Sequence, residues 1–246
     1  MLCDALPALA EMSEAEPALK LTQRAELDCC LAPAAAMRAY GRIASAAYRF
    51  AQDQVAYTAY QSALRNLSHL PLQLQSEAYA FLANALLESH SYNLIHNLAE
   101  QASRLTGFAA QEVLAVQAQA LAMQGQSTKA FEILHEFTSK QFHSDTLLRI
   151  GHALLEQNNP SAGGFFLAEA VRILAALARC CDRSVNTWAK GRLLELAACK
   201  GALMHVYASL VSVCHEGFLD PVETLRLKAE IANTLYHLCL LYTSDA

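Results

Sequence analysis

The stretch LLRIGHALLEQNNPSAGGFFLAEAV, residues 147–171, decides the fold of this chain. Apolar residues recur every three to four positions on both sides of the central NNP, which is typical of two amphipathic helices joined by a turn. Pro160 suits the first position of a helix, where its missing N–H would have no partner. Gly151 and Gly163 fall one in each predicted helix, so we interpret them as points of close helix packing rather than as a phosphate-binding loop.

Small residues recur at the same two positions in four successive segments. The first-helix positions hold Ala44, Ala83, Ala118 and Gly151, which are separated by 39, 35 and 33 residues. The second-helix positions hold Ala56, Ala130 and Gly163, and in the second segment Ile95 replaces the small residue. A step close to 34 residues predicts a repeated hairpin in which each unit buries its apolar face against its neighbours. An ordinary bundle of amphipathic helices is the alternative, although it does not explain a fixed step.

These spacings resemble the tetratricopeptide repeat family, whose unit is a helix-turn-helix of about 34 residues. That family also places large apolar residues at four further positions of each unit. Here those positions hold Tyr40, Ile43, Ala47 and Tyr60; Tyr79, Leu82, Leu86 and Ala99; Leu114, Gln117, Leu121 and Leu134; Leu147, Ile150, Leu154 and Leu167. The resemblance covers residues 37–172, and Gln117, Ala99 and the missing Trp depart from it. It implies an all-α fold, a right-handed superhelix of antiparallel hairpins.

The rest of the chain is also predicted to be helical, since no alternating β-branched or aromatic run marks a strand. We expect a capping segment over 1–32 with one helix from Ser13 to Leu31, four hairpins over 33–182, and longer helices over 183–238 that continue the array. Ser184 and Asp220 are the predicted N-caps of two of these helices. The final CLLYTSDA, 239–246, resembles translated read-through of a sequencing-library adapter, so we expect the native protein to differ after Leu238.

Composition excludes some classes of function. A formal charge of −5 disfavours direct nucleic-acid binding, which usually needs clustered Lys and Arg. The N-terminus lacks the basic start of a secretory leader, and no run of about 18 to 20 uncharged apolar residues indicates a membrane span. The eight cysteines form no C-x-x-C, so we interpret them as buried, reduced thiols. We therefore expect a cytoplasmic protein with no membrane partner.

The family resemblance also implies where a partner binds, because the first helix of each unit lines the concave face. The inward positions that carry polar or adaptable side chains are Glu77, Asn84, Glu88, Glu112, Gln119, Met123, Asp145, His152 and Glu156. In the first predicted hairpin the matching positions include Ser45 and Arg49. Amides can bond a peptide backbone, and the carboxylates favour a basic partner. The acidic residues near helix starts are equally explained by the helix macrodipole.

No pattern indicates an enzyme. His96 with Glu100 and His152 with Glu156 have the spacing of two ligands on one helix face, but two ligands do not close a metal site. We expect no catalysis, no metal and no cofactor. The predicted function is a scaffold or adaptor that binds a protein or peptide on its concave face. The alternative is the sensor region of a larger transcriptional or signalling regulator, of which this chain is a fragment.

Overall fold

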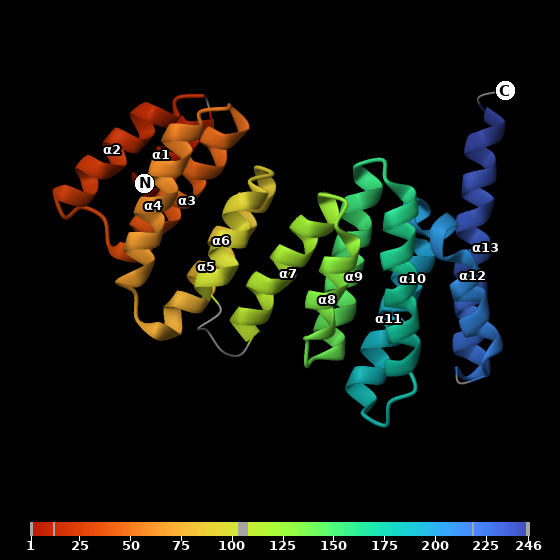
Figure 1. Ribbon diagram of the computed structural model, residues 1–246. Helices are drawn as coiled ribbons and strands as arrows, with labels where there is room; N and C mark the ends of the chain where they lie inside the picture. The colour runs from red at the N-terminus through yellow and green to blue at the C-terminus, as the bar shows by residue number, and fades with distance from the viewer. Residues whose placement is uncertain (1, 12, 103–107, 218, 245–246) are drawn as a thin grey trace. The chain divides into compact units, whose positions relative to one another are not determined.

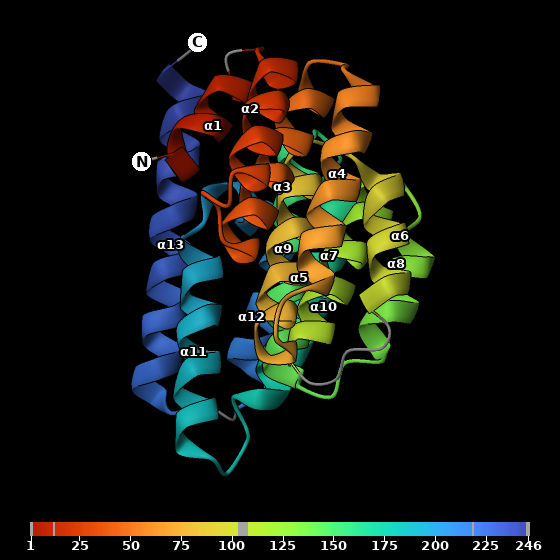
Figure 2. The same ribbon diagram turned by 90° about the vertical axis from the view of Figure 1, so that its left-hand side faces the viewer.

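The computed structural model describes residues 2–11, 13–102, 108–217 and 219–244, and in these ranges all regular secondary structure is helical (Figures 1 and 2). The predicted all-α class is confirmed. The helices are α1 (Leu2–Glu11), α2 (Ala15–Leu27), α3 (Pro33–Arg49), α4 (Asp53–Ser68), α5 (Leu72–Glu88), α6 (Tyr92–Ala102), α7 (Phe108–Met123), α8 (Ser127–His135), α9 (Lys140–Glu156), α10 (Pro160–Leu177), α11 (Arg183–Ala198), α12 (Lys200–His215) and α13 (Pro221–Ser244).

The helices form two compact units, residues 1–124 and residues 125–246. Helices α1 to α7 belong to the first unit and α8 to α13 to the second. The division falls between α7 and α8, within the stretch predicted to be the third hairpin.

The first unit is built around the hairpin of α3 and α4. Helices α1 and α2 pack against α3 on one side, and α5 packs against it on another, followed by α6 and α7 (Figure 2). Ala44, Ala56 and Ala83 are fully buried, as expected for residues where helices approach closely. Tyr40 and Tyr60 fill the space around them and are among the largest buried side chains. These five positions of the repeat pattern are therefore core positions.

The N-terminal segment differs from its prediction. Instead of one helix from Ser13 to Leu31, the chain forms α1 and then α2, which begins at Ala15 and ends at Leu27. A polar cluster joins α2 to the hairpin: the Tyr40 hydroxyl donates to Glu26 Oε2 over 2.6 Å, and Asn66 Nδ2 donates to Glu26 Oε1 over 2.9 Å. Although burial opposes it, these hydrogen bonds and the charge of Arg65 lower the pKa of Glu26.

In the second unit, α9 and α10 form the hairpin predicted from residues 147–171. A Cβ added at Gly163 would lie 2.9 Å from the carbonyl oxygen of Gly151, so the two backbones are in contact there. Asn158 has φ of 57° in the turn, and Asn159 Oδ1 accepts a hydrogen bond from the Ala162 N–H at the start of α10. The prediction that both glycines serve helix packing is confirmed.

Helices α11 and α12 follow α10 and are bent by 119° from one another, at Cys199. The N-cap of α11 is Asp182, whose carboxylate accepts hydrogen bonds from the N–H groups of Ser184 and Val185, so the prediction of Ser184 as the cap is wrong. Asp182 is preferred over Ser184 as the N-cap because the negative charge of its carboxylate also complements the helix dipole. Helix α13 begins as predicted, since Asp220 caps the N–H of Glu223. It packs on both α11 and α12.

The cysteines are less buried than predicted. Of those whose side chains are described, only Cys214 is buried, whereas Cys29, Cys30, Cys180 and Cys181 are exposed. Each of the adjacent pairs lies just after a helix, where the chain turns through solvent. All of the described cysteines are free thiols.

Within the described residues, α10 is long and apolar enough to cross a membrane, and α11 with α12 pass the same test as a bent pair. Half of the apolar window of α10 is buried by neighbouring helices. Because α10 packs against α9, α11 and α12, its apolar surface has a role in the core of the second unit.

Candidate functional site

A hollow of about 350 Å³ opens between α1, α3 and α5 in the first unit. Its walls combine charged, polar and apolar side chains: Glu11, Arg42, Ser45, Arg49, Phe81, Asn84, Ala85 and Glu88. This volume falls within the range of about 300–1,000 Å³ that is typical of ligand pockets. The hollow is therefore large enough to hold part of a peptide or a small polar molecule.

The hollow follows from how α3 and α5 pack. Arg42, Ser45 and Arg49 are separated by three and four residues, so they lie on one face of α3. The helices come close at Gly41, where an added Cβ would lie 3.1 Å from the Leu82 side chain. This contact anchors α5 beside α3. Asn84 is thereby placed in the same hollow as Ser45.

The hydroxyl of Ser45 is the most informative group in the hollow. Ser45 is 3% exposed, and its Oγ has no hydrogen-bond partner among the described residues. Buried hydroxyls usually bond a nearby carbonyl or another side chain, so one without a partner needs an explanation. Asn84 lies across the hollow and uses one amide hydrogen to bond the Ala80 carbonyl of its own helix, over 2.9 Å. A bound group could satisfy Ser45 and bond the remaining amide atoms of Asn84.

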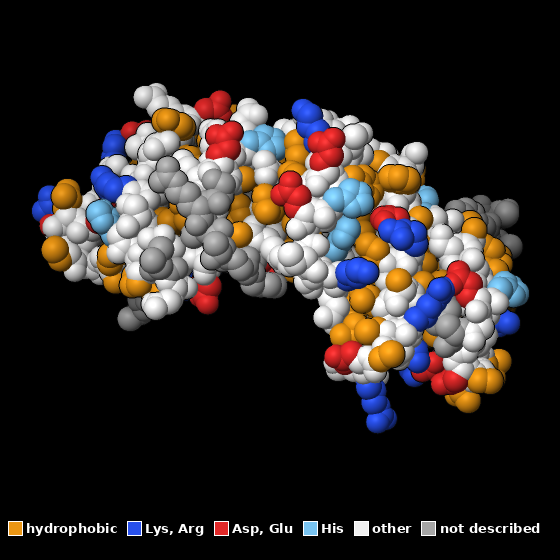
Figure 3. Space-filling model, turned by 60° about the horizontal axis from the view of Figure 1, so that its bottom comes forward, with side chains coloured by type: hydrophobic (Ala, Val, Ile, Leu, Met, Phe, Trp, Pro, Cys, Tyr) orange, Lys and Arg blue, Asp and Glu red, His pale blue; other side chains and the backbone are white. Residues whose placement is uncertain are grey.

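Charges of both signs line the hollow. Arg42 and Arg49 come from α3, Glu88 comes from α5, and Glu11 comes from α1. Their formal charges cancel, so the hollow does not select a purely anionic or purely cationic ligand. A mixed distribution is also visible on the face of the molecule in Figure 3, where basic and acidic side chains are interspersed with hydrophobic ones.

The structure brings only part of the predicted binding set together. Asn84 and Glu88 line the hollow, together with Ser45 and Arg49 of the matching positions in the first predicted hairpin. The other predicted residues of the first unit lie outside it. Glu77 is exposed on α5, Glu112 and Met123 are half-buried on α7, and Gln119 is buried on α7 with no partner for its Oε1 among the described residues.

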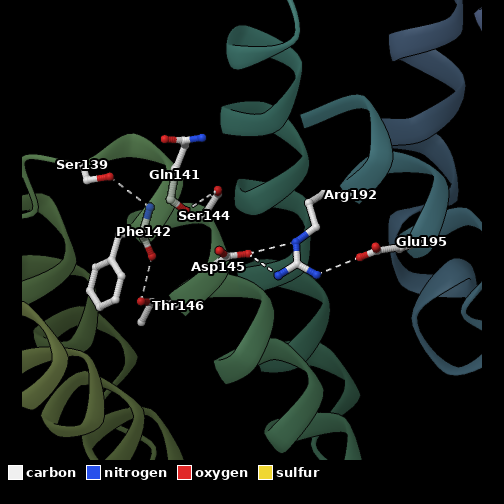
Figure 4. A network of polar contacts seen from close by, with 8 residues as sticks. All are labelled: Ser139, Gln141, Phe142, Ser144, Asp145, Thr146, Arg192 and Glu195. Carbon is white, nitrogen blue, oxygen red and sulfur yellow. Dashed lines mark hydrogen bonds and ion pairs between the residues drawn. The ribbon is translucent and has the colours of Figure 1, made fainter. Parts of the chain in front are cut away.

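In the second unit, the predicted carboxylate of Asp145 is engaged within the fold. Arg192 of α11 donates to Asp145 Oδ1 through its Nε over 3.0 Å and through Nη2 over 2.6 Å (Figure 4). The Nη1 of the same guanidinium donates to Glu195 over 2.7 Å, and its carbon lies 5.9 Å from the centre of the Trp188 ring. A basic partner would therefore compete with Arg192 for Asp145. His152 and Glu156 follow on α9, half-buried and exposed respectively.

Sequence reasoning missed Glu11, Arg42, Phe81 and Ala85 of the hollow. The repeat template did not assign Arg42 and Phe81 to the binding face. Each lies one helical turn before an assigned inward residue, Ser45 and Asn84 respectively, and this spacing could have indicated them. Glu11 could not be found in this way, because α1 itself was not predicted. Its position depends on how α1 packs against α3.

The described residues contain no group of three or more His, Cys, Asp or Glu side chains that could hold a metal ion. His96 Nε2 lies 3.4 Å from Gln124 Oε1, an amide rather than a further metal ligand. His143 is buried, which lowers its pKa, and its Nε2 has no described partner. It stacks edge-on with Phe137 and His135 and thus belongs to the packing of α8 and α9.

Comparisons with protein-family models, with curated proteins and with solved structures found no match for this chain.

Proposed function

We propose that this protein is a helical-repeat interaction module that binds a peptide segment of a protein partner in the hollow between α1, α3 and α5. Helices α3 and α5 are the first helices of the first two predicted hairpins. In tetratricopeptide-like superhelices this is the position from which ligands are contacted, and the hollow overlaps with part of the predicted binding face. Asn84 and Glu88 belong to both.

The buried hydroxyl of Ser45 carries the proposal. It is the only described side-chain atom of the hollow that is both buried and without a hydrogen-bond partner among the described residues, so it is available to a group bound there. A peptide backbone offers both N–H and C=O groups and can satisfy this hydroxyl and the Asn84 amide together. A buried polar group that bonds no protein atom needs an explanation, and a bound ligand provides one here.

The charges favour a peptide over a simple ion. Two guanidinium groups and two carboxylates around one hollow match a segment that presents both acidic and basic side chains. The Phe81 ring adds an apolar wall for an aliphatic or aromatic side chain. A segment with alternating charges and one apolar residue is therefore the expected ligand.

The test is selection of a displayed library of random peptides on the immobilised protein, followed by calorimetry with the best synthetic peptide. Ser45→Ala should weaken binding about 2- to 10-fold, the value of one neutral hydrogen bond. The same change should leave the free energy of unfolding unchanged or raise it, because it removes a hydroxyl that bonds no described residue of the chain.

Glu77→Gln is the matched control, since Glu77 is exposed on the same helix as Asn84 and Glu88 but outside the hollow. It should bind as the unchanged protein does. If Ser45→Ala and Glu88→Gln both bind the selected peptide as tightly as Glu77→Gln does, the hollow is not the binding site. If no peptide is selected and calorimetry instead shows a small metabolite binding in the hollow, the sensor function is favoured.

A further inference from the structure

The face of α13 opposite its packing partners carries a stripe of exposed apolar side chains. Val222 is 76% exposed, Leu225 is 69% exposed and Tyr236 is 62% exposed. Ala229 and Ala232 lie between them and are exposed as well. Large apolar residues exposed singly are ordinary, but a continuous stripe on one helix marks an interaction surface.

The spacing of the stripe is that of a coiled-coil seam. Its residues follow one another at intervals of three, four, three and four, and at about 100° per residue they fall within an arc of about 80°. The side chains that α13 buries against α11 and α12, namely Leu227, Ile231 and Thr234, lie on the opposite side. Helix α13 thus has one seam in the core of the second unit and another seam in solvent.

We propose that a second copy of this chain covers the stripe, with the two α13 helices antiparallel. Within the stripe, Leu225, Ala229, Ala232 and Tyr236 are placed symmetrically about the point midway between Ala229 and Ala232. An antiparallel copy therefore places Leu225 against Tyr236 of the second copy and Ala229 against Ala232, whereas Val222 lies beyond this symmetric part. The two small residues at the centre let the helices approach closely, and the large residues fill the space on either side.

The charges beside the stripe favour this orientation. Arg226 and Lys228 flank its N-terminal half, one on each side, whereas Asn233 and Leu235 flank its C-terminal half. A parallel copy would place Arg226 of one helix beside Lys228 of the other, which is unfavourable because the charges are alike. In the antiparallel arrangement the basic half of one helix lies against the uncharged half of the other. The opposed helix dipoles add a small favourable contribution.

The experiment is sedimentation velocity of the full chain at concentrations up to about 200 µM, where a dimer of micromolar affinity is populated. We expect a monomer–dimer equilibrium for the unchanged protein. Leu225→Glu and Tyr236→Lys should each raise the dissociation constant at least about tenfold, because each buries a charge in the seam. An equimolar mixture of the two variants should dimerise again, since the introduced carboxylate and ammonium then face each other.

Leu27→Glu is the matched control, because Leu27 is a leucine of similar exposure, 79%, at the end of α2. It should dimerise as the unchanged protein does, and far-UV circular dichroism should show all variants folded. A monomer throughout the concentration range overturns the proposal and assigns the stripe to another partner. Dimers that survive Leu225→Glu also overturn it. A mixture that stays monomeric overturns the antiparallel pairing of Leu225 with Tyr236.

Discussion

Gly163 offers a quantitative test of the contact between α9 and α10. In Gly163→Ala the added Cβ would lie 2.9 Å from the carbonyl oxygen of Gly151 and 3.0 Å from a side-chain carbon of Leu155. The carbonyl oxygen belongs to the backbone of α9, so the helices must separate by a few tenths of an ångström. Overpacking of this kind costs about 1–3 kcal/mol. The higher helix propensity of alanine offsets up to about 1 kcal/mol of this loss in stability.

Gly163→Ala should therefore lower the free energy of unfolding by about 1 kcal/mol, within a range of about 0–2 kcal/mol. Gly191→Ala is the matched control, since Gly191 lies inside α11 and an added Cβ there meets nothing within 4 Å. It should raise the stability by up to about 1 kcal/mol. The expected difference between the two variants is thus about 1–3 kcal/mol.

The assay is urea unfolding followed by the fluorescence of Trp188, the only tryptophan of the chain, which lies in the same unit as both glycines. Far-UV circular dichroism of the native state checks that the helix content is unchanged. If Gly163→Ala is as stable as Gly191→Ala, the backbones of α9 and α10 are not in contact, and the close-packing interpretation of both glycines fails.

Three further outcomes are expected. Glu26→Gln should lower the free energy of unfolding by about 1–2 kcal/mol at pH 7, because it weakens charged hydrogen bonds. Since the folded pKa of Glu26 lies below its ordinary value of 4.5, this loss is present above pH 4.5 and disappears as the pH falls through the folded pKa. Urea unfolding at several pH values can measure it. Asp182→Ala should lower the stability of the second unit by about 0.5–2 kcal/mol through loss of the α11 cap, read from Trp188 fluorescence; an unchanged midpoint would contradict the capping role. Cys180 should react with a thiol reagent at once in the native protein, whereas Cys214 should react only on unfolding, and mass spectrometry of labelled peptides would show the reverse order if their burial were misassigned.

Local features explain what could be predicted of the fold. Helical periodicity, the turn before Pro160 and the Asp220 cap act over a few residues, and each was found where the sequence placed it. The small residues at the repeated positions also proved to be buried, because close approach of two helices excludes larger side chains there.

The candidate site was only half predictable, for a different reason. The template placed Asn84 and Glu88 on one face of a helix, but it could not add Glu11 from a helix that the pattern did not reveal. Nor could it anticipate that Asp145 is held by Arg192, which is 47 residues away. Many carboxylates and guanidinium groups of the chain could form such a pair, and only packing selects among them.

The sequence by itself thus determined the helical class, the hairpin at residues 147–171 and the places where small residues are required, because these depend on period, capping and side-chain volume. Tertiary structure alone decided which helices share a hollow, which carboxylates are already paired, and that α13 leaves a second apolar stripe in solvent. These properties depend on contacts between residues far apart in the chain, and periodicity carries no information about the partner that a helix face will meet.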